Sequence, residues 1–345
     1  MHAAPPLPRP RGPLSERLLG RLAERPRSSG EPLLGRRAVA AADPWGDDLH
    51  VSLYTLLELG FRGLAGVDPG WEVQPGTVRA VNLLEDLFLE AVTAETGPTA
   101  GVITSGDVRR ELEALAHGDG PSLSTWVDEQ GTLDHLREFA VHRSAYQLKE
   151  ADPHTFALPR LAAGRAKAAF VEIQADEYGN GRPGRSHQEL FAATLRHLDL
   201  DDRYGAYVDV LPAPTLATVN LLSLFGRTRR WLGACVGHLA LFEMTSVGPM
   251  ARYARALRRF TGGVEGAEFY DVHVVADQHH QRLALDGMVT PFVAEEPDLA
   301  ADVVFGARAL TVVEGRLTEH LLDRWRSGRT SLCRPLADVG RTTAA

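Results

Sequence analysis

The chain has few of the features that mark disulfide-stabilised, membrane-spanning or nucleic-acid-binding proteins. It contains only two cysteines, Cys235 and Cys333, and their wide separation argues against a disulfide framework or a cysteine-rich metal site. The first 43 residues lack the continuous apolar run of a signal peptide or membrane span. The net charge of −8 gives no electrostatic reason to bind nucleic acid or an anionic membrane. We therefore expect a cytoplasmic protein whose partners are small molecules and metal ions.

The rest of the composition fits a protein with one substantial hydrophobic core. The chain has 345 residues, of which 44% are hydrophobic. Residues 1–43 are rich in proline, arginine, glycine and alanine, which predicts a mostly disordered tail. Beyond the tail few stretches alternate with a period of two, and none has a hairpin signal between two strands. The sequence therefore predicts an all-α fold.

Apolar residues recur at helical spacing along most of the chain after residue 44. The expected helices cover residues 49–61, 76–96, 106–117, 122–149, 160–177, 186–199, 214–225, 228–259, 265–290, 294–312 and 313–327. Glycine, proline and aspartate mark the loops between them.

The segment from Phe269 to His280 carries the strongest signal of metal chemistry. It places His273, Asp277 and His280 at i, i+4 and i+7 of one helix, so the three side chains share a face two turns long. Imidazole and carboxylate together suit non-haem iron, manganese or zinc. The adjacent His279 is at i+6 and rotates away from this face, so we favour His280 as the ligand.

Glu243 is the only charged residue in the apolar segment 239–247. A buried carboxylate without a partner costs several kcal/mol, so Glu243 needs a cation nearby. A salt bridge to an arginine of a neighbouring helix is one solution. A metal ion shared with the histidine-rich helix is the one that we favour.

Glu177 and His187 lie on either side of a break rich in glycine and proline. On one straight helix they would be about 15 Å apart, which is too far to share a metal centre. The glycines between them let the chain turn back so that both side chains can point into one site. Glu172 and Asp176 on the same segment are competing candidates. Glu150, at the end of an earlier helix, is either a further ligand or a solvated helix end.

These candidates together form a pattern that resembles the haem-oxygenase-like di-iron oxidases, also described as iron-containing redox enzymes. The resemblance is carried by Asp-Glu-Tyr-Gly-Asn-Gly with His187 ten residues after Glu177, by Phe-Glu-Met-Thr-Ser around Glu243, and by Phe-Tyr-Asp-Val-His-Val-Val-Ala-Asp-Gln-His-His. It implies a haem-oxygenase-like helical bundle with additional N-terminal helices. We accordingly divide the chain into a disordered tail (1–43), N-terminal helices that pack on the core (44–120), a di-iron bundle (121–332) and a C-terminal tail (333–345).

The resemblance also implies the cofactor and the reaction. Two Fe(II) ions are expected, with O₂ as co-substrate. The expected metal ligands are Glu150, Glu177, His187, Glu243, His273, Asp277 and His280. Glu177, Glu243 and Asp277 are the expected catalytic carboxylates, and a bridging role suits Glu243 or Asp277. The same ligand set would also suit manganese in one position.

The expected activity is O₂-dependent N-oxygenation of a small amine or amino-acid-like substrate in secondary metabolism, with an external electron donor and a homodimeric protein. Oxidative C–C cleavage or desaturation of an aliphatic or amino acid is an alternative. A non-catalytic iron-binding protein is another, although the Glu-x-x-His pairs of ferritin-like proteins are absent around Glu243. A haem oxygenase would need an early proximal histidine, for which His50 is the candidate.

Overall fold

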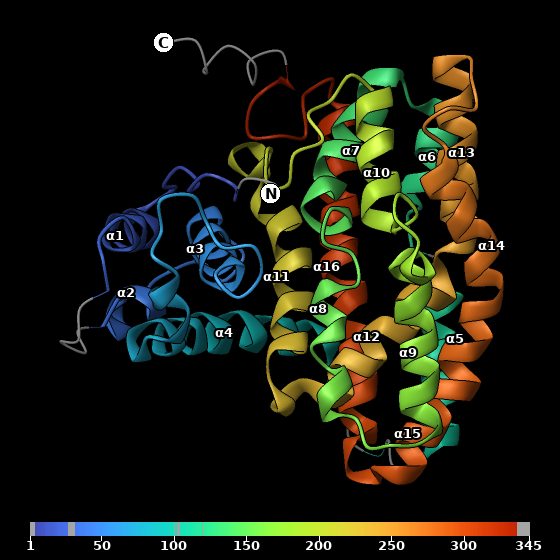
Figure 1. Cartoon of the computed structure of the whole chain (residues 1–345), viewed down its shortest axis with the longest axis horizontal. Helices are drawn as coiled ribbons and strands as arrows, with labels where there is room; N and C mark the ends of the chain where they lie inside the picture. Colours follow the sequence, from blue (N-terminus) through green and yellow to red (C-terminus); the bar gives the residue numbers. More distant parts are fainter. Residues whose placement is uncertain (1–3, 27–31, 100, 102–103, 119, 337–345) are drawn as a thin grey trace.

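The computed structural model describes residues 4–26, 32–99, 101, 104–118 and 120–336, and within these ranges every regular element is a helix. The predicted all-α class is therefore confirmed. The helices form a small N-terminal layer and a larger bundle of long helices, with α11 (Ala213–Arg227) between them (Figure 1). None of the helices in the described ranges is long and apolar enough to cross a membrane.

The N-terminal layer consists of four α-helices. They are α1 (Pro13–Leu22), α2 (Arg36–Ala40), α3 (Asp47–Glu58) and α4 (Pro75–Thr96). The prediction of a disordered tail over residues 1–43 is wrong for α1 and α2, whereas residues 1–3 and 27–31 lie outside the described residues. Leu14, Leu18 and Leu22 recur at i, i+4 and i+8 and are buried, so α1 has an apolar face that packs against the rest of the layer.

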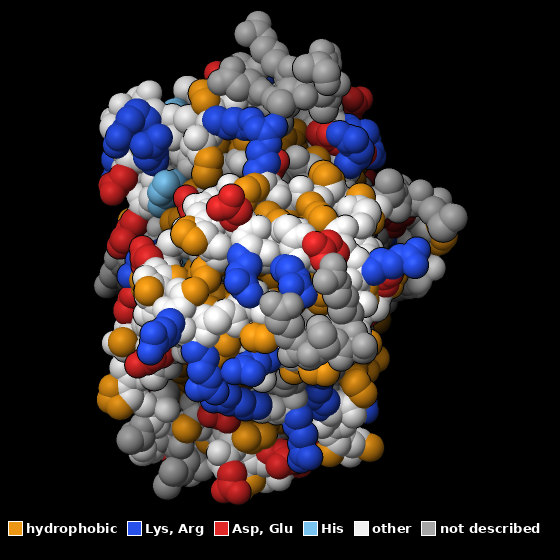
Figure 2. Space-filling model, turned by 90° about the vertical axis from the view of Figure 1, so that its left-hand side faces the viewer, with side chains coloured by type: hydrophobic (Ala, Val, Ile, Leu, Met, Phe, Trp, Pro, Cys, Tyr) orange, Lys and Arg blue, Asp and Glu red, His pale blue; other side chains and the backbone are white. Residues whose placement is uncertain are grey.

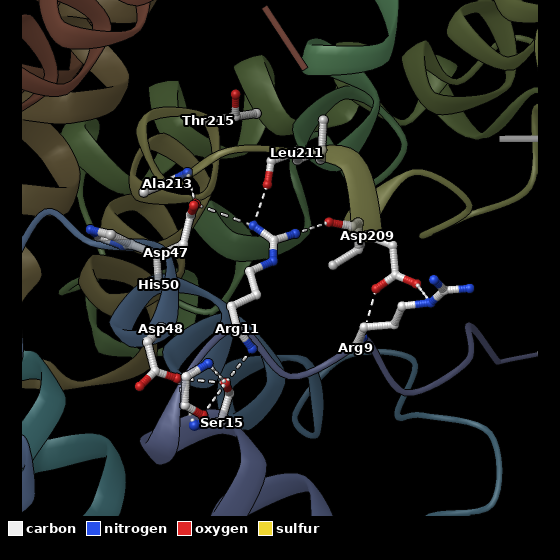
Figure 3. Close-up of polar contacts among 12 residues, drawn as sticks. Arg9, Arg11, Ser15, Asp47, Asp48, His50, Asp209, Leu211, Ala213 and Thr215 are labelled. Carbon is white, nitrogen blue, oxygen red and sulfur yellow. Dashed lines mark hydrogen bonds and ion pairs between the residues drawn. The ribbon is translucent and has the colours of Figure 1, made fainter. Parts of the chain in front are cut away.

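Polar contacts explain why the arginine-rich N-terminus is ordered (Figure 3). Both carboxylate oxygens of Asp48 accept hydrogen bonds from backbone N–H groups at the start of α1, at 2.9 Å from Leu14 and 2.8 Å from Ser15. The Arg11 guanidinium donates to the carbonyl oxygens of Leu211 at 2.5 Å and Val208 at 2.6 Å. Composition alone indicated a solvated tail because these partners are distant in sequence.

The bundle contains the α-helices that remain apart from α11. They are α5 (Ser105–Ala116), α6 (Leu123–Gln130), α7 (Leu133–Gln147), α8 (Asp152–Thr155), α9 (Arg165–Glu177), α10 (His187–His197), α12 (Leu232–Thr245), α13 (Val247–Thr261), α14 (Glu268–Arg282), α15 (Thr290–Glu295) and α16 (Ala300–Arg326). A π-helical segment, η6 (Leu283–Val289), joins α14 to α15. Short 3₁₀ segments are η1 (Pro69–Val73), η2 (Leu158–Arg160), η3 (Gly179–Gly181), η4 (Val208–Val210), η5 (Arg229–Trp231) and η7 (Pro297–Leu299).

Several predicted helices are divided or joined differently in the structure. The predicted helix over 122–149 is divided into α6 and α7 because Thr132 caps α7, its hydroxyl accepting a hydrogen bond from the His135 N–H at 3.3 Å. The predicted helix over 228–259 is divided at Ser246. The predicted helices over 294–312 and 313–327 are one continuous helix, α16. Of the predicted tail 333–345, residues 337–345 lie outside the described residues.

The pairing of α12 with α16 forms the centre of the bundle, and it depends on two glycines. A β-carbon on Gly237 of α12 would overlap the Val303 carbonyl group, and one on Gly306 of α16 would overlap the Ala234 carbonyl group. The two backbones therefore approach more closely than side chains would allow. This contact fixes α12, which carries Glu243, in the interior of the bundle.

The outer surface is of mixed polarity. Figure 2 shows the side of the molecule that lies at the left of Figure 1, where lysine and arginine side chains gather among acidic and hydrophobic ones. The net charge of −8 is therefore not spread as a uniform acidic surface over this face.

Candidate metal centre

The seven predicted ligands come from five parts of the bundle and are all buried. Glu150 follows α7, Glu177 ends α9, His187 begins α10, Glu243 lies in α12, and α14 carries His273, Asp277 and His280. Because each helix end or helix face delivers its side chain to the same interior point, the structure brings the whole predicted set together.

The ligand atoms form two overlapping groups. Glu150, Glu177, His187 and His273 offer four atoms that all lie within 4.8 Å of one another, and Glu177, Glu243 and His280 offer three. Asp277 adjoins the second group, with its Oδ1 at 3.5 Å from His280 Nδ1. Glu177 belongs to both groups. The bridging role that we expected for Glu243 or Asp277 stays a prediction.

A tight reversal of the chain places Glu177 beside His187, as the glycines between them predicted. Gly179 has a φ of 64°, and a β-carbon there would lie 2.5 Å from the backbone of Arg185. Only glycine therefore permits the chain to fold back so closely. The result is a distance of 2.6 Å between Glu177 Oε2 and His187 Nδ1, in place of the separation expected on a straight helix.

Several of these buried atoms have no hydrogen-bond partner outside the cluster among the described residues, and their nearest partners are other atoms of the cluster. They are Glu177 Oε2, His187 Nδ1, His273 Nε2, Asp277 Oδ1 and His280 Nδ1. Buried polar atoms are normally paired, and an isolated group of unpaired ones costs free energy. Nitrogen and oxygen lone pairs that converge on one point fit a bound cation, and the mixture of carboxylate and imidazole suits iron.

Two of the histidines are oriented through the ring nitrogen that faces away from the cluster. His273 Nδ1 lies 2.7 Å from the Phe269 carbonyl oxygen, and His280 Nε2 lies 2.9 Å from Asp176 Oδ2. Such contacts fix the tautomer and turn the other nitrogen toward a metal. Asp176, which the sequence offered as a competing ligand, instead contacts a ligand.

Two carboxylates of the cluster are also held by neighbours that sequence reasoning missed. The Ser246 hydroxyl donates to Asp277 Oδ2 at 2.5 Å. The Gln147 side-chain nitrogen donates to Glu150 Oε1 at 2.8 Å when the amide is oriented so that it faces the carboxylate. Gln147 belongs to no recognisable motif. Ser246 ends the Phe-Glu-Met-Thr-Ser segment, but that segment gave no sign that its serine contacts Asp277.

The crowding of acids and imidazoles changes their proton affinities. Burial, together with Asp277 and Glu177, raises the pKa of Glu243 to about 8. Burial disfavours the charged form of His273, but the nearby Glu150 carboxylate favours it more strongly. The pKa of this imidazole is therefore raised to about 10. Asp277 and Glu243 likewise overcome the burial of His280 and raise its pKa to about 11. Protons and metal ions therefore compete for the same atoms.

The structure also places the residues for which the sequence left alternative roles open. His50 lies in the N-terminal layer, where its ring packs edge-on against Phe88 with centroids 4.7 Å apart, so it is not part of the buried centre. His279 faces away from the cluster and contacts the exposed Glu172 at 2.9 Å, as the helical register predicted. Glu243 contacts His280 at 3.2 Å, so its buried partner is an imidazole of the cluster.

Two similarities to known proteins concern this part of the chain. A family model described as iron-containing redox enzyme matches residues 137–314, the part of the chain that contains all seven clustered residues. The nitrosourea synthase of Streptomyces achromogenes subsp. streptozoticus is 26% identical over 151 residues, which are 44% of this chain and 32% of that protein. The similarity thus spans about a third of the relative's own length.

Proposed function

Because the chain belongs to the iron-containing redox enzymes, whose family model matches just over half of its residues, we propose that the buried cluster binds two Fe(II) ions and uses O₂ to oxygenate a nitrogen atom of a small amine or amino-acid-like substrate. Residues 150–280 would supply all of the metal ligands.

The position of Glu177 in both ligand groups is the observation that carries this proposal. A carboxylate has two oxygens and can therefore hold two metal ions side by side. Glu150, His187 and His273 would complete one site, and Glu243, Asp277 and His280 the other. The four carboxylates offer four negative charges, which balance two divalent ions in a buried setting.

Nitrogen as the site of oxidation is supported by the similarity to the nitrosourea synthase. The name of that protein says that it makes a nitrosourea, and a nitrosourea contains an oxidised nitrogen. For the present chain we propose the simplest reaction of this kind. One atom of O₂ enters an N–H bond to give N–OH. The other leaves as water, with two protons and with two electrons from a reduced flavin or a similar external donor.

Two bound Fe(II) ions would supply the electrons that O₂ needs at the start of the reaction. Residues around the cluster hold the ligand side chains in position. Phe269 and Asp176 orient His273 and His280, and Ser246 fixes the carboxylate of Asp277. Burial of the cluster excludes bulk water, which strengthens the electrostatic interactions inside it.

The test is O₂ consumption by the iron-loaded protein with a panel of amines and amino acids, followed by mass spectrometry after labelling with ¹⁸O₂. A product heavier by one labelled oxygen that is bound to nitrogen is expected. Labelled oxygen on carbon, or loss of hydrogen or of a carbon fragment, would instead identify C–H or C–C oxidation. Iron binding without any O₂ consumption would identify a non-catalytic iron-binding protein.

A further inference from the structure

A cavity of about 430 Å³ lies beside the cluster of carboxylates and histidines, and residues of α5, α6, α7, α10, α12, α13, α14 and α16 line it. Phe242, Ser246 and Met250 line both this cavity and the small space among the clustered carboxylates and histidines. The cavity, which we call the side chamber, therefore borders the place where the metal ions would react. Its volume is in the range of pockets that enclose small organic ligands.

The walls of the side chamber are mainly aromatic and aliphatic. Large apolar contributors are Phe139, Phe191, Leu241, Phe242, Met250 and Phe269. The charged residues among its described walls are Arg143, Glu314 and Glu319. Arg143 donates two parallel hydrogen bonds to Glu314, at 2.7 and 2.6 Å, so these two charges neutralise each other. Glu319 is exposed.

A glycine in the middle of α16 keeps part of this space open. Gly315 lines the side chamber, and a β-carbon built on it would meet no atom of the described residues within 4 Å. Gly306 on the same helix has a packing reason, since its β-carbon would overlap the Ala234 carbonyl group. Glycine in a helix interior costs roughly 0.5–1 kcal/mol relative to alanine. Because packing does not require glycine at position 315, we attribute it to the volume that it leaves free.

One residue that lines the side chamber carries a buried, unpaired hydroxyl. Tyr270 is buried, and its hydroxyl has no hydrogen-bond partner among the described residues. An unpaired buried hydroxyl costs free energy that a ligand with a hydrogen-bonding group would recover.

We propose that the side chamber binds the substrate and selects an amine with an uncharged aliphatic or aromatic body. This inference rests on the proposed function for the choice of an amine. The apolar walls favour the body, because burying apolar surface is favourable. A second charged group on the body, as in lysine or glutamate, would be buried against walls where the interior charges of the described residues, Arg143 and Glu314, already neutralise each other, which is costly. The amine nitrogen would lie at the end of the chamber formed by Phe242, Ser246 and Met250.

The experiment is anaerobic calorimetric titration of the Fe(II)-loaded protein with 2-phenylethylamine, L-lysine and decanoate. We expect the phenylethylamine to bind at least tenfold more tightly than either of the others. In the Gly315→Phe variant the new aromatic ring would fill the side chamber. The affinity of this variant for 2-phenylethylamine should fall at least tenfold, while the number of iron ions that it binds is unchanged. Gly315→Ala adds only one methyl group and should retain binding within a few-fold.

Equal binding of 2-phenylethylamine to wild type and Gly315→Phe would overturn the assignment of the side chamber. Binding of L-lysine or decanoate as tight as that of the amine would overturn the substrate class. If Gly315→Phe fails to fold, Leu241→Trp narrows the same chamber from α12 and replaces it in the comparison. Since the titration excludes O₂, its outcome is separate from that of the oxygenation assay: binding without N-oxygenation would contradict the proposed function alone.

Discussion

Lys149 and Glu58 form a fully buried ion pair, with Lys149 Nζ at 3.1 Å from Glu58 Oε2. Glu58 lies at the end of α3 in the N-terminal layer, and Lys149 directly precedes Glu150 in the sequence. Glu58 also accepts a hydrogen bond from the Tyr204 hydroxyl at 2.6 Å. The N-terminal layer, which lies outside the family match at residues 137–314, is thus directly attached to the segment that carries one of the clustered carboxylates.

Replacing Lys149 by methionine should disturb both stability and iron binding. The substitution leaves the Glu58 carboxylate buried without its cation, which typically costs about 3–5 kcal/mol. Urea unfolding measures this loss. Because residue 149 positions Glu150, iron affinity should also fall about tenfold. The double variant Lys149→Met/Glu58→Gln is the control and should recover most of the stability. An unchanged unfolding midpoint in the single variant would contradict the importance of this pair.

Removing the carboxylate of Asp176 should weaken iron binding without removing a ligand. In Asp176→Ala, His280 loses the acceptor that lies 2.9 Å from its Nε2. Loss of such a partner typically reduces metal affinity about 10- to 100-fold. Glu172→Ala is the matched control, because Glu172 on the same helix contacts the exposed His279 and should not affect iron binding. Equal iron affinities of the two variants, measured by competition with a chelator, would rule out this role of Asp176.

Replacing each of two glycines of α16 by alanine should change the stability of the protein in opposite directions. Gly306→Ala forces α12 and α16 apart, because the new β-carbon overlaps the Ala234 carbonyl group, and it should lower the melting temperature by several degrees. Gly315→Ala adds a methyl group in open space and should stabilise the helix by about 0.5–1 kcal/mol. Thermal unfolding of both variants tests this contrast, and destabilisation by Gly315→Ala would show that position 315 is packed rather than open.

Mild acid should destabilise the protein through His50. Burial lowers the pKa of this imidazole to about 3, whereas in the unfolded chain it is near 6.5. The unfolded state therefore binds the extra proton as pH falls below 6.5, and stability is lost on the acid side. At pH 5 the loss is about 2 kcal/mol.

The stability difference between wild type and His50→Gln isolates this effect, because titrations that the two proteins share cancel. Between pH 7 and pH 5 the free energy of unfolding of the wild type should fall by about 2 kcal/mol more than that of His50→Gln. A pH-independent difference in urea unfolding would mean that His50 does not remain neutral in the folded protein.

The parts of this structure that local sequence determines were predictable. Helical spacing alone placed His273, Asp277 and His280 on one face, and the glycines after Glu177 predicted the reversal that brings His187 back. The first helix, α1, was mispredicted as part of a disordered tail because Arg11 and Asp48 act through partners that the sequence does not reveal. The Lys149–Glu58 pair joins residues 91 positions apart, and the side chamber arises from several helices together. Neither has a local signature.

The most direct test of the central claim is the number of Fe(II) ions bound by the metal-free protein under anaerobic conditions, compared among wild type, His280→Ala and His279→Ala. These two histidines are adjacent on α14, but only His280 points into the cluster. We predict two ions for wild type and for His279→Ala, and one for His280→Ala because the group of Glu150, His187 and His273 remains. Equal stoichiometry in all three proteins, or a single ion in wild type, would contradict a di-iron centre built around Glu177.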